Sequence, residues 1–308
     1  MTRQEAAGLA LLVLAVLLAP FLLYPIFAMK LLCFALFACA YDLLLGYAGL
    51  MSLGHAAFFG LGGYVAAWLA KSLGATPELA VLAAGGAAAG LGLVVGALAI
   101  RRQGIYFAMI TLALAQLVYF VCVQAPFTHG EDGIQGVPRG ALFGLWSLAD
   151  DRALYAVVAA VFLAGFLFLR RVVHSPFGQV LQAIRENEMR ARSLGYRVGR
   201  YKLLAFVLSA GLSGMAGGLK ALVYGIATLS DVHVAMSGQV VLMVLLGGMG
   251  TLFGPVLGAA LVVGMQDRLA GFGEWVTVIQ GLIFIFAVLA LRQGVMGGLS
   301  RLAHRVRG

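Results

Sequence analysis

The 308-residue chain is 62% hydrophobic and 11% charged, with a mean hydropathy of +1.00. An average soluble domain carries about 25% charged residues, so this composition leaves too little polar surface for a water-soluble fold. The net charge of +9 does not indicate nucleic-acid binding, because the basic residues lie in short loops beside apolar runs, as in positive-inside membrane topology.

The predicted fold is all-α, a polytopic membrane bundle of about ten segments that forms a single domain over residues 1–308. A β-barrel is disfavoured because the apolar runs are continuous and rich in Leu and Ala, whereas barrel strands alternate. In chain order the predicted spans are 6–23, 26–45, 57–69, 79–100, 105–124, 153–169, 203–225 and 276–291. The first run resembles a signal peptide but is long and lacks a clear cleavage site, so we expect it to be retained as a span.

The stretch 237–266 is ambiguous. Most Lys and Arg residues lie at 101–102, at 170–202 and in the tail after 291, whereas the acidic residues fill the alternate loops. Both ends of the chain then lie in the cytoplasm if this stretch makes two passes around the helix-breaking turn 247–255. Two short helices and a re-entrant pair both satisfy this requirement.

A second glycine-rich region, 46–63, is too rich in glycine for a plain helix and must be packed inside the protein or line a cavity. Asp42, Ser52 and His55 lie beside or within it and are candidates for the translocation pathway. The structural alternatives are that Asp42 caps the break and that His55 bonds backbone groups freed there.

The sequence contains no GxxxxGK[ST] loop, no HExxH pair and no GxSxG elbow, so no nucleotide-binding, metal-protease or esterase motif is present. The three cysteines, Cys33, Cys39 and Cys122, fall inside apolar segments and suggest neither a disulfide framework nor a zinc site. We expect no cofactor in this chain. If it belongs to an energy-dependent transporter, the ATP would have to be used by partner subunits.

Residues 175–201 form the only long polar segment. Ser175 and Pro176 give a helix start signal. The run that follows is amphipathic, with Val180, Leu181 and Ile184 on one side, and Gly195 is expected to end the helix. Periodicity alone leaves two readings open, a contact with a cytoplasmic partner and a helix lying on anionic lipid.

Four motifs resemble the permease subunits of bacterial ABC importers for branched-chain amino acids. They are LLLGYAGLMSLGHAAFFGLGGY (43–64), THGEDGIQGVP (128–138), SPFGQVLQAIRENEMRARSLGYRVGRYKLLAFVLSA (175–210) and LLGGMGTLFGPVLGA (245–259). The resemblance implies an inner-membrane permease for branched-chain or related amino acids. Its implied partners are cytoplasmic ATP-binding subunits, a homologous second permease and a periplasmic substrate-binding protein.

The resemblance also implies that a loop over 174–202 docks into the ATPase, with the docking helix on 182–195. The docking residues would be Arg185, Glu186, Glu188, Arg192 and Gly195. The general importer signature, Glu-Ala-Ala followed three residues later by Gly, is not reproduced, because Met189 and Arg190 stand where its Glu and first Ala would fall. The alternatives are an ion-coupled secondary transporter of small neutral or zwitterionic solutes and, third, a membrane-embedded enzyme.

Overall fold

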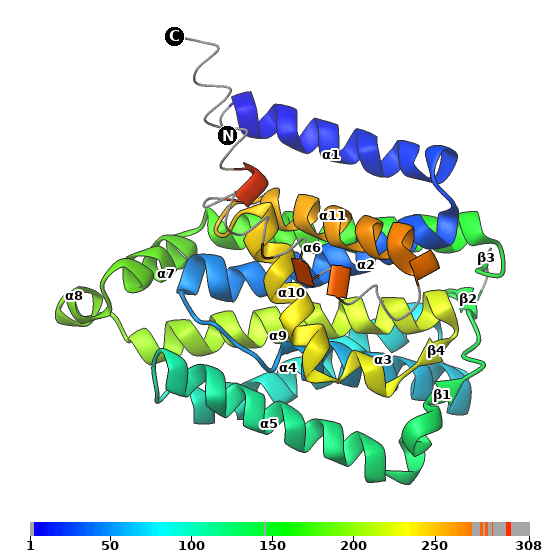
Figure 1. Ribbon diagram of the computed structural model, residues 1–308, viewed down its shortest axis with the longest axis horizontal. Helices are drawn as coiled ribbons and strands as arrows, with labels where there is room; N and C mark the ends of the chain where they lie inside the picture. The colour runs from blue at the N-terminus through cyan, green and yellow to red at the C-terminus, as the bar shows by residue number, and fades with distance from the viewer. Residues whose placement is uncertain are drawn as a thin grey trace.

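The computed structural model describes residues 3–144 and 146–272, together with 278, 279, 281, 282, 285 and 294–296. Helices make up nearly all of the regular structure in this part (Figure 1), which confirms the predicted all-α polytopic fold. In chain order the α-helices are α1 (Arg3–Leu22), α2 (Pro25–Asp42), α3 (His55–Ser72), α4 (Pro77–Ala99), α5 (Ile105–Gln124), α6 (Asp151–Val173), α7 (Pro176–Glu186), α8 (Glu188–Ser193), α9 (Val198–Tyr224), α10 (Val234–Gly247) and α11 (Gly254–Leu269).

Six helices of the described part are long and apolar enough to cross a membrane, namely α1, α2 with its π-helical extension η1 (Leu43–Ala48), α4, α5, α6 and α9. The shorter helices α3, α10 and α11 match the remaining predicted segments in that part. The last predicted segment, 276–291, lies largely outside the described residues.

The bundle has two distinct ends, which Figure 1 shows at left and right. At one end, which we call the hairpin end, α7 and α8 project beyond the other helices. At the opposite, strand end, β1 (Ile134–Gln135) pairs antiparallel with β4 (Ile226–Ala227), and β2 (Ala141–Leu142) pairs with β3 (Trp146–Ser147). Four short 3₁₀ turns, η2 (Pro126–Thr128), η3 (Gly130–Asp132), η4 (Leu229–Asp231) and η5 (Ala270–Phe272), complete the regular structure of this part.

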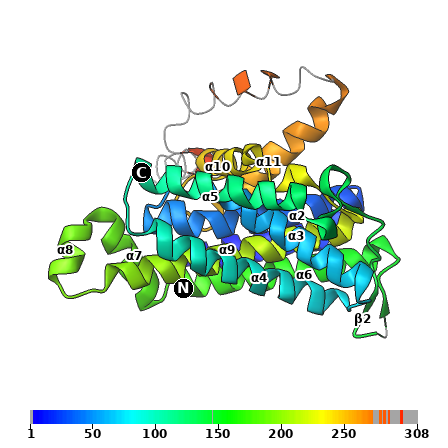
Figure 2. The same ribbon diagram turned by 90° about the horizontal axis from the view of Figure 1, so that it is seen from below.

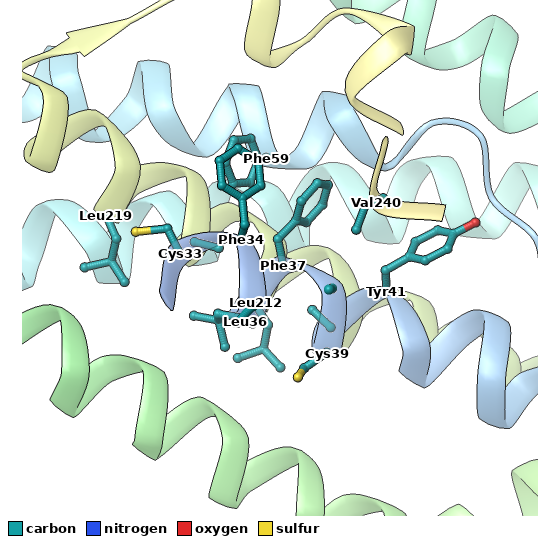
Figure 3. Close-up of a cluster of buried hydrophobic side chains, with 14 of the residues drawn as sticks. Cys33, Phe34, Leu36, Phe37, Cys39, Tyr41, Phe59, Leu212, Leu219 and Val240 are labelled. Carbon is teal, nitrogen blue, oxygen red and sulfur yellow. The ribbon is translucent and has the colours of Figure 1, made fainter. Parts of the chain in front are cut away.

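Helix α2 forms the centre of the bundle. In the apolar stretch formed by α2 and η1, 89% of the residues are buried inside the protein, compared with 11% in α1. Its side chains meet neighbours on more than one side (Figure 3). Phe37 and Phe59 of α3 place their ring centroids 4.6 Å apart. On the other side of α2, Leu36 lies beside Leu212 of α9. The apolar surface of α2 therefore packs against protein, whereas the equally apolar α1 leaves most of its surface exposed.

Glycines allow α3, α4 and α9 to approach closely. A Cβ at Gly214 would lie 2.3 Å from Ala88 Cβ, and one at Gly62 would lie 2.2 Å from Gly214 O. Small residues four apart produce this kind of backbone contact between membrane helices. The prediction that the whole of 46–63 is broken is therefore wrong. From His55 onward the segment is helical and its glycines let α3 pack closely against its neighbours, so only residues 49–54 are irregular.

Helix α10 runs from the strand end of the bundle toward the hairpin end, and α11 runs back after the turn that joins them (Figure 1). Asp231, just before α10, pairs with Lys220 of α9 at 2.5 Å near the strand end. Gly250, just after α10, donates its N–H to Asp42 Oδ1 at 2.9 Å near the hairpin end. The stretch 237–266 forms two short helices joined at 248–253; whether both cross the membrane or form a re-entrant pair stays a prediction.

Candidate functional site

The hairpin formed by α7 and α8 is the most prominent projection of the described chain (Figures 1 and 2). Pro176 stands in the first turn of α7, where its missing N–H costs nothing. Gly178 makes the sharp bend from α6 possible, since a Cβ there would lie 2.1 Å from Val173 O. Leu181 and Ile184 are buried against the bundle, so the amphipathic pattern correctly predicted which face of α7 is covered.

Asn187 divides the predicted single helix into two. Its backbone is extended at φ −156° and ψ 98°, and its side chain accepts a hydrogen bond from the Arg190 N–H at 2.9 Å. This is the geometry of an N-cap, a position that asparagine favours. The prediction of one helix across this segment is wrong, because periodicity does not register a capping residue inside an amphipathic run.

Gly195 ends α8 as predicted. Its φ is +88°, a left-handed conformation that favours glycine. The Tyr196 N–H donates to Ala191 O at 3.2 Å and the Gly195 N–H donates to Arg192 O at 3.0 Å, which together form a Schellman motif.

Most of the charges assigned to docking are engaged within the chain. Glu188 forms ion pairs with Lys202 at 2.5 Å and with Arg192 at 2.9 Å. Arg185 donates a hydrogen bond to the Gly46 carbonyl oxygen. Glu186 is exposed. These contacts fasten the hairpin to α9 and to η1, while the role of the charges in docking stays a prediction.

Two apolar side chains that sequence reasoning overlooked dominate the exposed tip of the hairpin. Met189 is 73% exposed and Leu194 is 70% exposed. Both stand outside the periodic apolar face of α7, so the pattern that found Leu181 and Ile184 could not reveal them. Contiguous exposed apolar patches mark protein contact surfaces, and these two side chains are available to contribute to such a surface.

Behind the hairpin, three elements meet at a junction made by Asp42, Gly46, Arg185 and Gly250. Gly46 lies inside η1, a π-helix, which is a type of segment often found at functional sites. A Cβ on Gly46 would lie 2.1 Å from Asp42 Oδ1 and 2.4 Å from Gly250 N. The junction therefore joins α7, the end of α2 and the α10–α11 turn through contacts that only glycine permits.

The candidate pathway residues lie in the protein interior. Asp42 belongs to the junction, while Ser52 and His55 are fully buried. His55 Nδ1 lies 3.0 Å from Ser52 Oγ, and His55 Nε2 lies 2.9 Å from Ser209 Oγ of α9. In this conformation they have hydrogen-bond partners and support the irregular segment, as expected for backbone packed inside the protein. Their role in translocation stays a prediction.

Comparison with known proteins assigns the family. A sequence model of the family described as branched-chain amino acid transport system, permease component, matches residues 23–288. The chain belongs to this family. The matched region includes the hairpin, the junction and both glycine-rich segments.

This permease is similar to the "High-affinity branched-chain amino acid transport system permease protein LivM" of Escherichia coli K12 and of Salmonella typhimurium LT2. Each is 29% identical over 278 residues, which cover 83% of this chain and 65% of the relative. The "Autoinducer 2 import system permease protein LsrC" of Klebsiella pneumoniae is 32% identical over 231 residues, 72% of this chain and 63% of the relative. The chain thus spans 65% of the length of the LivM relatives. No solved structure matches.

Proposed function

We propose that this chain is the membrane-spanning permease subunit of an ABC importer for branched-chain or related amino acids. Separate ATPase subunits bind the hairpin, a second permease completes the membrane assembly, and a periplasmic binding protein delivers the substrate at the strand end. The protein lies in the bacterial inner membrane, with its hairpin and both termini in the cytoplasm. Membership of the permease family and the names of the similar proteins support this function.

The observation that carries the proposal is the projecting hairpin with its exposed apolar tip. Met189 and Leu194 would be covered by the ATPase, whereas Glu188 and Arg192 hold the tip in shape through the ion pairs described above. This division of roles explains why the importer signature can be absent while the hairpin keeps a docking role.

The junction gives the hairpin a route into the membrane helices. A movement of α7 reaches η1 through Arg185 and the Gly46 carbonyl, and it reaches the α10–α11 turn through Asp42 and Gly250. Closure of the ATPase subunits on ATP would therefore shift α2, α10 and α11 together. Such a connected set of hydrogen bonds is a physical means of coupling two sites.

The test replaces both tip residues by aspartate, M189D together with L194D. Charges at these positions would have to be buried on docking, so we expect loss of ATPase co-purification while the permease still inserts into the membrane. The matched control is Leu73→Asp, which places one charge on another exposed leucine, 63% accessible, at the strand end. Co-purification of the ATPase with the double variant at the level of the control would refute the docking surface.

A further inference from the structure

Helix α5 lies along the outside of the bundle, on the opposite edge from α1 in Figure 1. Only 28% of its apolar window is buried. Its exposed large side chains are Ile105, Tyr106, Met109, Leu117, Phe120 and Val121. An apolar face of this kind is compatible with lipid, so by itself it does not indicate a partner.

Gln116 changes that interpretation. It is exposed and is the twelfth of the 20 residues of α5, so it lies roughly 16 Å from one end of the helix and about 12 Å from the other. Its short side chain cannot reach the headgroups on either side. The described part of the chain offers its carboxamide no hydrogen bond. An amide without a partner is strongly unfavourable in hydrocarbon relative to water.

The outward faces of the other helices described over residues 3–144 and 146–272 have no such group near mid-span. Helix α1 carries no polar side chain from Ala6 to Leu22, and α4 carries none from Leu79 to Ala99. Among the membrane helices that the structure describes, Gln116 is the one carboxamide, hydroxyl or charged side chain that is exposed near mid-span. Of the helix faces that the structure describes, that of α5 is therefore the one that lipid alone would leave with an unpaired polar group.

The polar surface continues onto α10. Tyr119 of α5 and His233, the N-cap of α10, place their rings edge to face with centroids 5.6 Å apart. Gln116 precedes Tyr119 by about one turn of α5. Half-buried Gln239 follows His233 by about 9 Å along the axis of α10. Gln116 thus lies about one turn from the contact between α5 and α10.

We propose that the exposed face of α5, together with the adjoining edge of α10, is the surface on which the second permease subunit packs, and that this subunit supplies the hydrogen-bond partner of Gln116. The inference rests on the proposed function and deepens it by locating the joint between the two permeases. The depth of Gln116 excludes an ATPase or a periplasmic protein as its cover. The folded chain itself leaves Gln116 exposed, and Tyr, Phe and Met are side chains enriched at protein interfaces.

The test measures lipid contact at Gln116 with a spin label on Gln116→Cys. The matched control is Leu14→Cys, because Leu14 is also exposed and is the twelfth residue of α1. The three native cysteines are buried. Collision with dissolved oxygen, which concentrates in lipid, is recorded in nanodiscs for the isolated chain and for the transporter purified with its second permease and ATPase subunits.

We expect oxygen contact at position 116 to fall severalfold on assembly while position 14 stays unchanged. The proposal is overturned if position 116 remains as accessible as position 14 in the assembly, or if it is already shielded in the isolated chain. It is also overturned if a label at exposed Leu82 of α4, beside the exposed pair Gly86 and Gly90, is shielded instead. Substrate-stimulated ATP hydrolysis identifies a functional assembly, so lipid contact at position 116 in an active transporter refutes the interface and leaves the proposed function standing.

Discussion

Replacing Gly46 by alanine tests whether the junction couples the hairpin to the membrane helices. The added methyl group would lie 2.1 Å from Asp42 Oδ1 and 2.4 Å from the Gly250 nitrogen. The backbone offers no room for it, so the hydrogen bond from Gly250 to Asp42 must lengthen or break. The substitution adds a single methyl group at the contact between Asp42 and Gly250, so a loss of transport can be assigned to that contact.

Two contributions set its magnitude. Overpacking by one methyl group costs about 1–3 kcal/mol, and leaving a buried acceptor without its donor costs about 1–3 kcal/mol. If the junction forms in only one of the two alternating conformations, the combined loss of about 2–6 kcal/mol from that conformation shifts their ratio by at least about 30-fold. We therefore expect Gly46→Ala to reduce transport at least several-fold.

The assay is ATP-driven uptake into proteoliposomes, with ATPase co-purification measured in parallel. Gly46→Ala should keep the ATPase bound, because the tip of the hairpin is unchanged, yet lose coupling between ATP hydrolysis and uptake. Gly90→Ala is the matched control, since a Cβ there meets nothing within 4 Å. Uptake by Gly46→Ala at the rate of this control, with an unchanged melting temperature, would refute the role of the junction.

Two further predictions concern stability. Lys220→Met removes the ion-pair partner of Asp231, a buried carboxylate, and should lower the free energy of unfolding, measured by thermal unfolding, by about 3–5 kcal/mol. Adding Asp231→Leu should restore most of this stability. A double variant no more stable than the single one would contradict the pairing. Gly195→Ala places a side chain at φ +88°, so it should lower the free energy of unfolding by about 1–2 kcal/mol and weaken ATPase binding. Gly199→Ala, in the helical first turn of α9, should do neither. Equal behaviour of these two variants would contradict the proposed helix end.

Local chemistry predicted the parts of the fold that depend on neighbouring residues. Apolar run length predicted the membrane helices, Pro176 predicted the start of α7, and Gly195 predicted the end of α8. Asn187 shows the limit of this approach, because a single cap divided a helix whose periodicity was uninterrupted.

The contacts that assemble the candidate site join residues far apart in sequence, so their partners could not be assigned from local patterns. Asp42 binds Gly250 across 208 positions and His55 lies beside Ser209 across 154 positions. The exposure of Met189 and Leu194 likewise depends on how α8 turns away from α9. Sequence reasoning singled out the polar loop, whose docking role stays a prediction, and overlooked the apolar side chains at its tip.

The most direct test of the central claim is uphill amino-acid uptake into proteoliposomes, measured with the permease pair alone and after addition of the ATPase subunits, ATP and the binding protein. Accumulation should require the ATPase subunits and ATP, and it should persist when a protonophore collapses the proton gradient. Uphill uptake by the permeases alone, driven by an ion gradient, would contradict the proposal that an external ATPase drives this protein through its hairpin.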